Sequence, residues 1–183
     1  MKNLLKTKLP KFELNAYDPE KDEFVVVNSQ DLADKWTILF FYPADFTFVC
    51  PTELEDLASF HSELKKMGVE VLSVSKDTHF VHKGWHDNSE KIKKIKYKML
   101  ADPKAKLMKK LGVYNKENSV AERATFVFNS QGDLKLIEIN DDGIGRGAKE
   151  LVRKIKAAQY VEKNPNAACQ ANWEEGKDDA LEP

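Results

Sequence analysis

The chain has few cysteines and lacks the spacings that make cysteine a structural element. Its 183 residues include two cysteines, Cys50 and Cys169, which form neither a Cys-x-x-Cys pair nor a zinc-finger spacing. A disulfide framework and a zinc finger are therefore excluded. In a reducing compartment we expect no permanent disulfide, although a transient catalytic one is compatible with this composition.

Strong net charge and long apolar runs are also missing. The formal net charge is −1, so there is no basic field of the kind that binds nucleic acid or anionic membranes. The Lys-rich stretch 91–98 interleaves apolar residues and is interpreted as a solvated face. No apolar run approaches the ~18 residues of a membrane helix, and residues 1–10 lack the apolar core of a secretory signal. We expect a cytoplasmic protein.

What the chain does have is a strong β-α-β pattern in its first half. Residues 36–42 are apolar on both faces, as in a central strand, and Val69–Ser75 forms a second apolar run. Between them, one helix is predicted from Cys50 to a stop at Gly68. The apolar residues at helical spacing are Leu54, Leu57, Phe60, Leu64 and Met67.

The remaining pattern completes a mixed α/β fold. Strands are expected at residues 24–27, 125–129 and 134–140, the last two joined as a hairpin at Gln131–Gly132, and helices at 79–88, at 105–111 and around Leu151–Ala158. The expected fold class is α/β, a thioredoxin-like mixed β-sheet flanked by helices. We expect this domain to span residues 1–160, followed by a polar C-terminal arm at 161–183.

Cys50 is the strongest candidate for chemistry. It follows a strand, a proline and a loop, and it opens the predicted helix, where backbone N–H groups favour a thiolate. A buried structural cysteine is the alternative, and position alone leaves both open. Thr47, Arg123 and Pro43 could complete a site, while turn support, a surface ion pair and a strand end are their plainer interpretations.

A family resemblance favours catalysis. The segment FYPADFTFVCPT resembles the Pro-x-x-x-Thr-x-x-Cys signature of typical 2-Cys peroxiredoxins, and more narrowly their alkyl hydroperoxide reductase (AhpC) branch. The similarity continues through SVSKDTHFVHKGWH, KIKYKMLADP, ERATFVFNSQG, GIGR and RKIKAAQYV, so it covers nearly the whole chain. It implies a thioredoxin-fold peroxidase that needs no cofactor or metal and reduces hydrogen peroxide and organic hydroperoxides in antioxidant defence.

The resemblance also implies roles for individual residues. Cys50 matches the peroxidatic cysteine, which peroxide oxidises to a sulfenic acid. The residues that match the rest of the active site are Pro43, Thr47 and Arg123, with Glu53 and Arg146 as a supporting pair that orients the catalytic arginine.

Cys169 matches the resolving cysteine, which a partner subunit contributes to an intersubunit disulfide with Cys50. A disulfide reductase, either an AhpF-like flavoprotein or a thioredoxin, would then reduce that disulfide. The resemblance further implies homodimers that assemble into a decamer. Gln170 stands where the family often has proline after this cysteine, and the effect of that departure stays open.

Two other classes of function share features with this sequence. A thioredoxin-like disulfide oxidoreductase would share the fold, but Cys50 is followed by Pro-Thr-Glu rather than by a Cys-x-x-Cys partner. A holdase chaperone is compatible with peroxidase activity, so the sequence does not exclude it.

His79, His82 and His86 recur on one predicted helical face. They suggest either a metal site or polar packing beside Trp85, and packing is favoured because no cysteine or paired carboxylate completes a ligand set. Trp173 in the arm is expected to anchor on a partner chain.

Overall fold

A computed structural model describes residue 5 and residues 7–181 of the chain. The expectations for residues 1–10 and for the end of the arm lie partly outside these residues. The chain divides into two compact units, one ending at Arg146 and one beginning at Gly147. Within the described residues, no helix is long and apolar enough to cross a membrane.

The first unit contains a seven-stranded mixed sheet in the order β2-β1-β5-β4-β3-β8-β9. β3 pairs in parallel with β4 and antiparallel with β8, which confirms the predicted β-α-β unit. The predicted hairpin is also confirmed, because β8 pairs antiparallel with β9. The strands are β1 (Glu13–Asp18), β2 (Glu23–Asn28), β3 (Trp36–Phe41), β4 (Val69–Ser75), β5 (Lys98–Ala101), β6 (Tyr114–Asn115), β7 (Val120–Ala121), β8 (Arg123–Phe128) and β9 (Leu134–Asn140).

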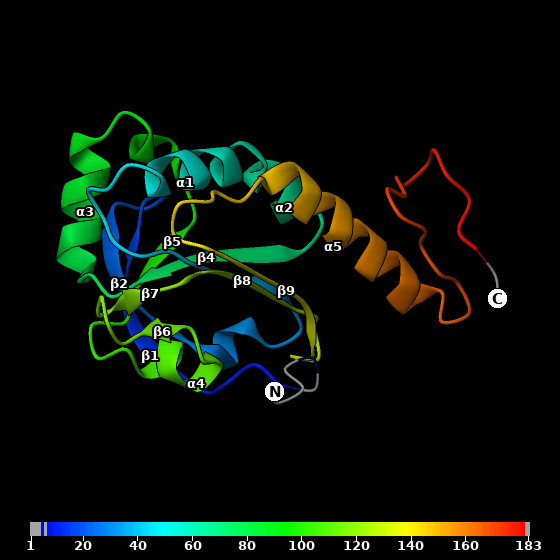
Figure 1. Ribbon diagram of the computed structural model, residues 1–183, viewed down its shortest axis with the longest axis horizontal. Coiled ribbons are helices and arrows are strands. Elements are labelled where there is room, and N and C mark those ends of the chain that lie inside the picture. Colours follow the sequence, from blue (N-terminus) through cyan, green and yellow to red (C-terminus); the bar gives the residue numbers. More distant parts are fainter. Residues whose placement is uncertain (1–4, 6, 182–183) are drawn as a thin grey trace. The chain divides into compact units, whose positions relative to one another are not determined.

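Helices cover both faces of this sheet. Figure 1 shows α1 and α2 over one face, and α4 with the small β6–β7 ribbon over the other. The helices of the first unit are α1 (Cys50–Ser59), α2 (His61–Lys66), α3 (His79–Asn88) and α4 (Lys106–Leu111), with short 3₁₀ turns η2 (Ser29–Leu32) and η3 (Ile92–Lys94).

The single helix predicted after Cys50 is wrong in one respect, since it is broken at Phe60 into α1 and α2. The Phe60 N–H donates to the Leu57 carbonyl at 3.2 Å, and this i→i−3 bond tightens the last turn of α1. The apolar stripe survives the break, because Leu54, Leu57 and Leu64 are all fully buried. Gly68 ends α2 with φ of 73°, as a stop residue should.

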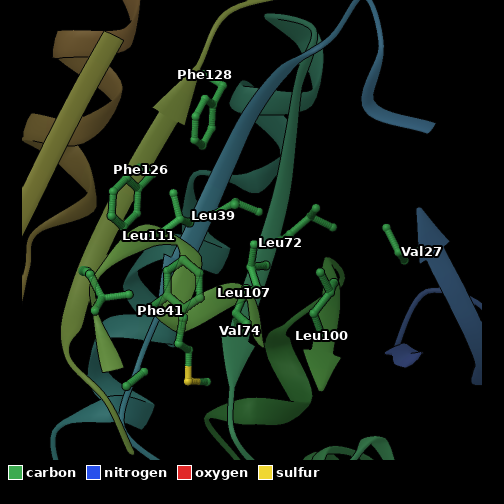
Figure 2. Close-up of a cluster of buried hydrophobic side chains, with 14 of the residues drawn as sticks. Val27, Leu39, Phe41, Leu72, Val74, Leu100, Leu107, Leu111, Phe126 and Phe128 are labelled. Atoms are coloured by element: carbon green, nitrogen blue, oxygen red, sulfur yellow. The ribbon is translucent and has the colours of Figure 1, made fainter. Parts of the chain in front are cut away.

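Successive side chains of β3 point to opposite faces of the sheet, so its six buried residues pack on both faces. Leu39 and Phe41 point into a cluster that also takes up Leu107 and Leu111 of α4 (Figure 2). Phe40 therefore faces the opposite side of the sheet. With both faces covered, β3 is a rigid central element that ends directly before the loop leading to Cys50.

The second unit holds α5 (Ala148–Lys163) and an irregular segment. Within this unit, the Trp173 ring lies 4.9 Å from the Tyr160 ring, and its Nε1 donates to the Asp178 carbonyl at 3.0 Å. Arg153 Nη1 donates to the Trp173 carbonyl at 3.1 Å. Trp173 thus has packing partners in its own chain, whereas the sequence suggested a partner chain.

Candidate active site

The loop that joins β3 to α1 is held tightly at its start. The Tyr42 N–H donates to the Val74 carbonyl at 3.1 Å, which extends the β3–β4 pairing by one residue. Pro43 follows and is buried. Phe46 has φ of 56°, a left-handed conformation that is unfavourable for a residue with a side chain. The loop is therefore strained, and other contacts must hold it in place.

Cys50 is the first residue of α1 and is fully buried. Pro51 suits this first turn because it lacks the N–H that would otherwise have no partner there. The N-terminus of a helix carries the positive end of its dipole, which favours a thiolate over a thiol. Cys50 is thus as buried as a structural cysteine, yet it lies at the positively charged end of α1.

Arg123, the first residue of β8, points its guanidinium at Cys50. Nη1 donates to Cys50 Sγ at 3.3 Å and to Glu53 Oε2 at 2.8 Å. Nε donates to the Asp142 carbonyl at 2.6 Å, and Nη2 to Asp142 Oδ1 at 3.2 Å. Arg123 is 4% exposed, so its plainer interpretation as a surface ion pair is wrong.

The protonation of Arg123 follows from these contacts. Burial lowers the pKa of its guanidinium, but the hydrogen bond to Cys50 and the charges of Cys50 and Glu53 outweigh burial, so the pKa is raised. A permanent positive charge therefore lies against the sulfur.

Glu53 and Arg146 form the second layer of the site. Arg146 donates to Glu53 Oε1 from its backbone N at 2.9 Å and from Nε at 2.8 Å, and to Oε2 from Nη2 at 3.2 Å. Its Nη1 donates to Thr125 Oγ1 at 3.1 Å, and its guanidinium lies 3.6 Å from the centre of the Phe40 ring. Burial lowers the pKa of Arg146, and Glu53 opposes that shift. With Cys50 ionised, two buried negative groups balance two arginines.

Thr47 lies in the loop three residues before Cys50, and its hydroxyl donates to the Ala44 carbonyl at 2.9 Å. This bond supports the turn, and no direct hydrogen bond to Cys50 accompanies it among the described contacts. Because the hydroxyl proton is already engaged, the Thr47 oxygen remains an acceptor for an incoming O–H group.

Cys169 lies in the second unit and is half-buried, with Sγ 3.8 Å from the Ala157 carbonyl. Burial raises the pKa of its thiol, and the charge of Arg153 opposes the shift. It is therefore mainly a thiol at neutral pH, and it must lose its proton before it can act as a nucleophile.

Three contributors to the site were not predicted: Asp142, Thr125 and Phe40. Asp142 lies in an acidic turn before the GIGR segment, which is a weak signal for an arginine partner. Thr125 and Phe40 carry no such signal, because only the register of β3 and β8 brings them to Arg146.

One histidine of α3 is held by hydrogen bonds within the fold. His82 is fully buried, with Nδ1 at 2.8 Å from Asp45 Oδ2 and Nε2 at 3.1 Å from the Leu100 carbonyl, so both ring nitrogens are engaged. Over the described residues, no group of three His, Cys, Asp or Glu side chains is placed to hold a metal ion.

Comparison with known proteins relates this chain to one family. The family model described as AhpC/TSA matches residues 5–137. A protein named alkyl hydroperoxide reductase C from Staphylococcus saprophyticus is 49% identical over 181 residues, covering 99% of this chain and 95% of its own. One of the same name from Staphylococcus aureus is 51% identical over 174 residues, covering 95% and 92%.

Solved structures of related proteins are similar to this chain as well. The crystal structure of Enterococcus faecalis AhpC has a TM-score of 0.88 at 49% identity and covers 92% of this chain and 99% of its own. The reduced 2-Cys peroxiredoxin of Plasmodium vivax has a TM-score of 0.89 at 32% identity and covers 94% and 90%. The chain therefore belongs to the AhpC/TSA family, and it is a peroxiredoxin, a thiol-dependent peroxidase with a thioredoxin-like fold.

Proposed function

We propose that this peroxiredoxin reduces hydrogen peroxide and organic hydroperoxides at Cys50, with Arg123, Thr47 and Pro43 completing the active site. The observation that carries the proposal is the 3.3 Å hydrogen bond from Arg123 Nη1 to Cys50 Sγ. The names of its relatives support alkyl hydroperoxides as one class of substrate.

The first step is attack of the Cys50 thiolate on one peroxide oxygen. The O–O bond breaks, Cys50 becomes a sulfenic acid, and the other oxygen takes a proton and leaves as water or an alcohol. We assign the Thr47 oxygen the role of accepting a hydrogen bond from the peroxide O–H, because its own proton is engaged by the Ala44 carbonyl. Pro43 is a buried residue of the same loop, and we assign it the role of keeping water from the thiolate.

Ionisation alone cannot account for such a reaction. A free cysteine with a pKa of ~8.5 is about 3% thiolate at pH 7, so full ionisation gains about 30-fold. Enzymes commonly accelerate reactions by ~10⁶ or more. The larger share must come from holding the O–O bond and stabilising charge on the departing oxygen. Arg123, which Glu53 and Arg146 hold in place, is the charged donor available for this role.

The second step forms an intersubunit disulfide. Cys169 of the partner subunit attacks the Cys50 sulfenic acid, water leaves, and a dithiol reductase, an AhpF-like flavoprotein or a thioredoxin, restores both thiols. Disulfide geometry requires Cα atoms within roughly 7 Å, so the buried first turn of α1 must unwind to expose Cys50.

This cycle requires a homodimer, which we expect to assemble further into a decamer, and residues 161–183 act as the arm that carries Cys169. We place the enzyme in the cytoplasm, because its thiols must be returned to the reduced state.

Peroxide consumption by the reduced protein with a dithiol reductant tests the proposal. The Cys50→Ser variant should lose all activity. Without the dithiol, the Cys169→Ser variant should consume one equivalent of peroxide per Cys50 and form no disulfide-linked dimer on a non-reducing gel. Full turnover by the Cys50→Ser variant would refute the proposal.

A further inference from the structure

A buried polar network lies next to the loop that precedes Cys50. The Tyr42 hydroxyl donates to Asp45 Oδ1 at 2.7 Å, and Asp45 Oδ2 lies 2.8 Å from His82 Nδ1. The other ring nitrogen, Nε2, lies 3.1 Å from the Leu100 carbonyl. The side chains of Asp45 and His82 are both fully inaccessible to solvent. Water therefore cannot replace any of these contacts.

The partners fix the number of hydrogens in this network. The Leu100 carbonyl can only accept, so His82 Nε2 must carry a hydrogen. Without a hydrogen between them, Nδ1 and Asp45 Oδ2 would be two acceptors in contact. One hydrogen therefore lies between them, on an imidazolium beside a carboxylate or on a carboxylic acid beside a neutral ring. Both arrangements are neutral overall, which is what burial demands.

Asp45 is fixed through its backbone as well. Its N–H donates at 3.0 Å to Asp77 Oδ2, which also accepts from the Ser75 hydroxyl at 2.7 Å. The next residue is Phe46, which has the left-handed φ, and its ring lies 6.0 Å from the Trp85 ring. The network thus immobilises the residue directly before the strained position.

We propose that the Asp45–His82 pair is a positioning device for the peroxide reaction. By sharing one hydrogen, it holds the strained turn at residues 44–47 that places the Thr47 hydroxyl and seats Cys50 at the start of α1. The inference rests on the proposed function, because the groups it positions are those of the peroxidatic site. Neither residue touches the peroxide, and both act through the loop.

The test compares variants that keep or remove the shared hydrogen. Asp45→Asn keeps it, because the amide can donate to Nδ1 of a neutral ring and its oxygen still accepts from Tyr42. Asp45→Ser is too short to reach His82. His82→Gln keeps a donor for Leu100 but leaves Asp45 without its hydrogen. Asp87→Ser, an exposed substitution on the same helix, is the matched control.

Two quantities are measured on each reduced protein: the rate constant for Cys50 oxidation by hydrogen peroxide, and amide hydrogen exchange in the peptide that covers residues 43–50. We expect Asp45→Asn and Asp87→Ser to stay within about twofold of the unmodified protein. Asp45→Ser and His82→Gln should be about 10- to 100-fold slower, the cost of a displacement near 1 Å, with faster exchange confined to that peptide. Because these two variants break the same bond from opposite sides, either one suffices if the other does not fold.

The inference is overturned if both hydrogen-removing variants react at the unmodified rate, if Asp45→Asn loses as much as they do, or if the rate falls with no change in loop exchange. If the unmodified protein does not oxidise Cys50 with peroxide at all, the proposed function fails instead.

Discussion

Arg146 holds the buried Glu53 carboxylate at three points: its backbone N–H and Nε bond Oε1, and its Nη2 bonds Oε2. Glu53 Oε2 also accepts from Arg123, whose Nη1 reaches Cys50. One carboxylate therefore orders both guanidinium groups. Its charge keeps two buried cations from repelling each other, and this arrangement aims Arg123 at the sulfur.

Glu53→Gln should destabilise the fold. The amide keeps the shape of the side chain but removes the charge that both arginines need, and breaking a buried ion pair costs about 3–5 kcal/mol. The free energy of unfolding in urea measures this loss. Glu150→Gln is the control, since Glu150 pairs with Arg153 at the surface and should cost about 0–1 kcal/mol. Equal losses in the two variants would contradict the role assigned to Glu53.

Arg123→Lys should slow peroxide reduction more than it slows general thiol chemistry. A lysine keeps a positive charge but cannot bond Cys50, Glu53 and Asp142 together. Loss of one such donor commonly costs about 10²- to 10³-fold in rate, whereas the thiolate fraction of an ordinary cysteine with a pKa of ~8.5 is only about 30-fold below full ionisation at pH 7.

The comparison needs two electrophiles on one protein. The rate with hydrogen peroxide depends on the ionisation of Cys50 and on stabilisation of the departing oxygen. The rate with iodoacetamide, measured on the folded protein, depends on the ionisation of Cys50. Equal losses for both reagents would mean that Arg123 acts on Cys50 ionisation only.

The members of the site were predictable from sequence, but their arrangement was not. Thr47 and Cys50 lie in one short motif, and Arg123 lies at the start of a strand, so each has a local signal in the sequence. That Arg123 contacts Cys50 depends on the antiparallel pairing of β3 with β8, which sets both residues at one end of the sheet. Asp45 and His82 are 37 positions apart, and no local pattern links them.

The secondary structure also contains elements that the sequence predicted and elements that it did not. Strands with strong apolar runs, such as β3 and β4, and the helix α3 were predicted closely. β1 and β5 lie outside the predicted strands, because β1 mixes exposed and buried residues without alternation and β5 is four residues long after a lysine-rich stretch. Their pairing with each other and with neighbouring strands, rather than their own pattern, stabilises them.

Disulfide formation should accelerate with pH. Burial raises the pKa of Cys169, so at neutral pH the thiol predominates and only the small thiolate fraction can attack the sulfenic acid. Below that pKa, each unit of pH should raise the rate of the disulfide-forming phase about tenfold. The measurement is the rate of dimer formation on non-reducing gels after a single pulse of peroxide at pH 6.5 to 8.5.

Arg153→Met sharpens this test. The charge of Arg153 lowers the Cys169 pKa against the effect of burial, so the variant should have a still higher pKa and a slower disulfide phase at each pH, with the peroxide step unchanged. A phase that is flat with pH in both proteins would show that a step other than Cys169 ionisation, such as unwinding of α1, limits the rate.

Two glycines should respond to alanine in opposite directions. Gly68 has φ of 73° at the end of α2, and a Cβ there would have no heavy atom within 4 Å, so only the backbone conformation opposes a side chain. Gly68→Ala should cost about 1–2 kcal/mol. Gly84 lies inside α3 with equally open surroundings, and Gly84→Ala should gain about 0.5–1 kcal/mol, because alanine loses less backbone freedom on folding. Urea unfolding of both variants measures the two changes, and neither should alter the rate of Cys50 oxidation. If Gly68→Ala were neutral, α2 would have to end differently from the left-handed turn that Gly68 forms.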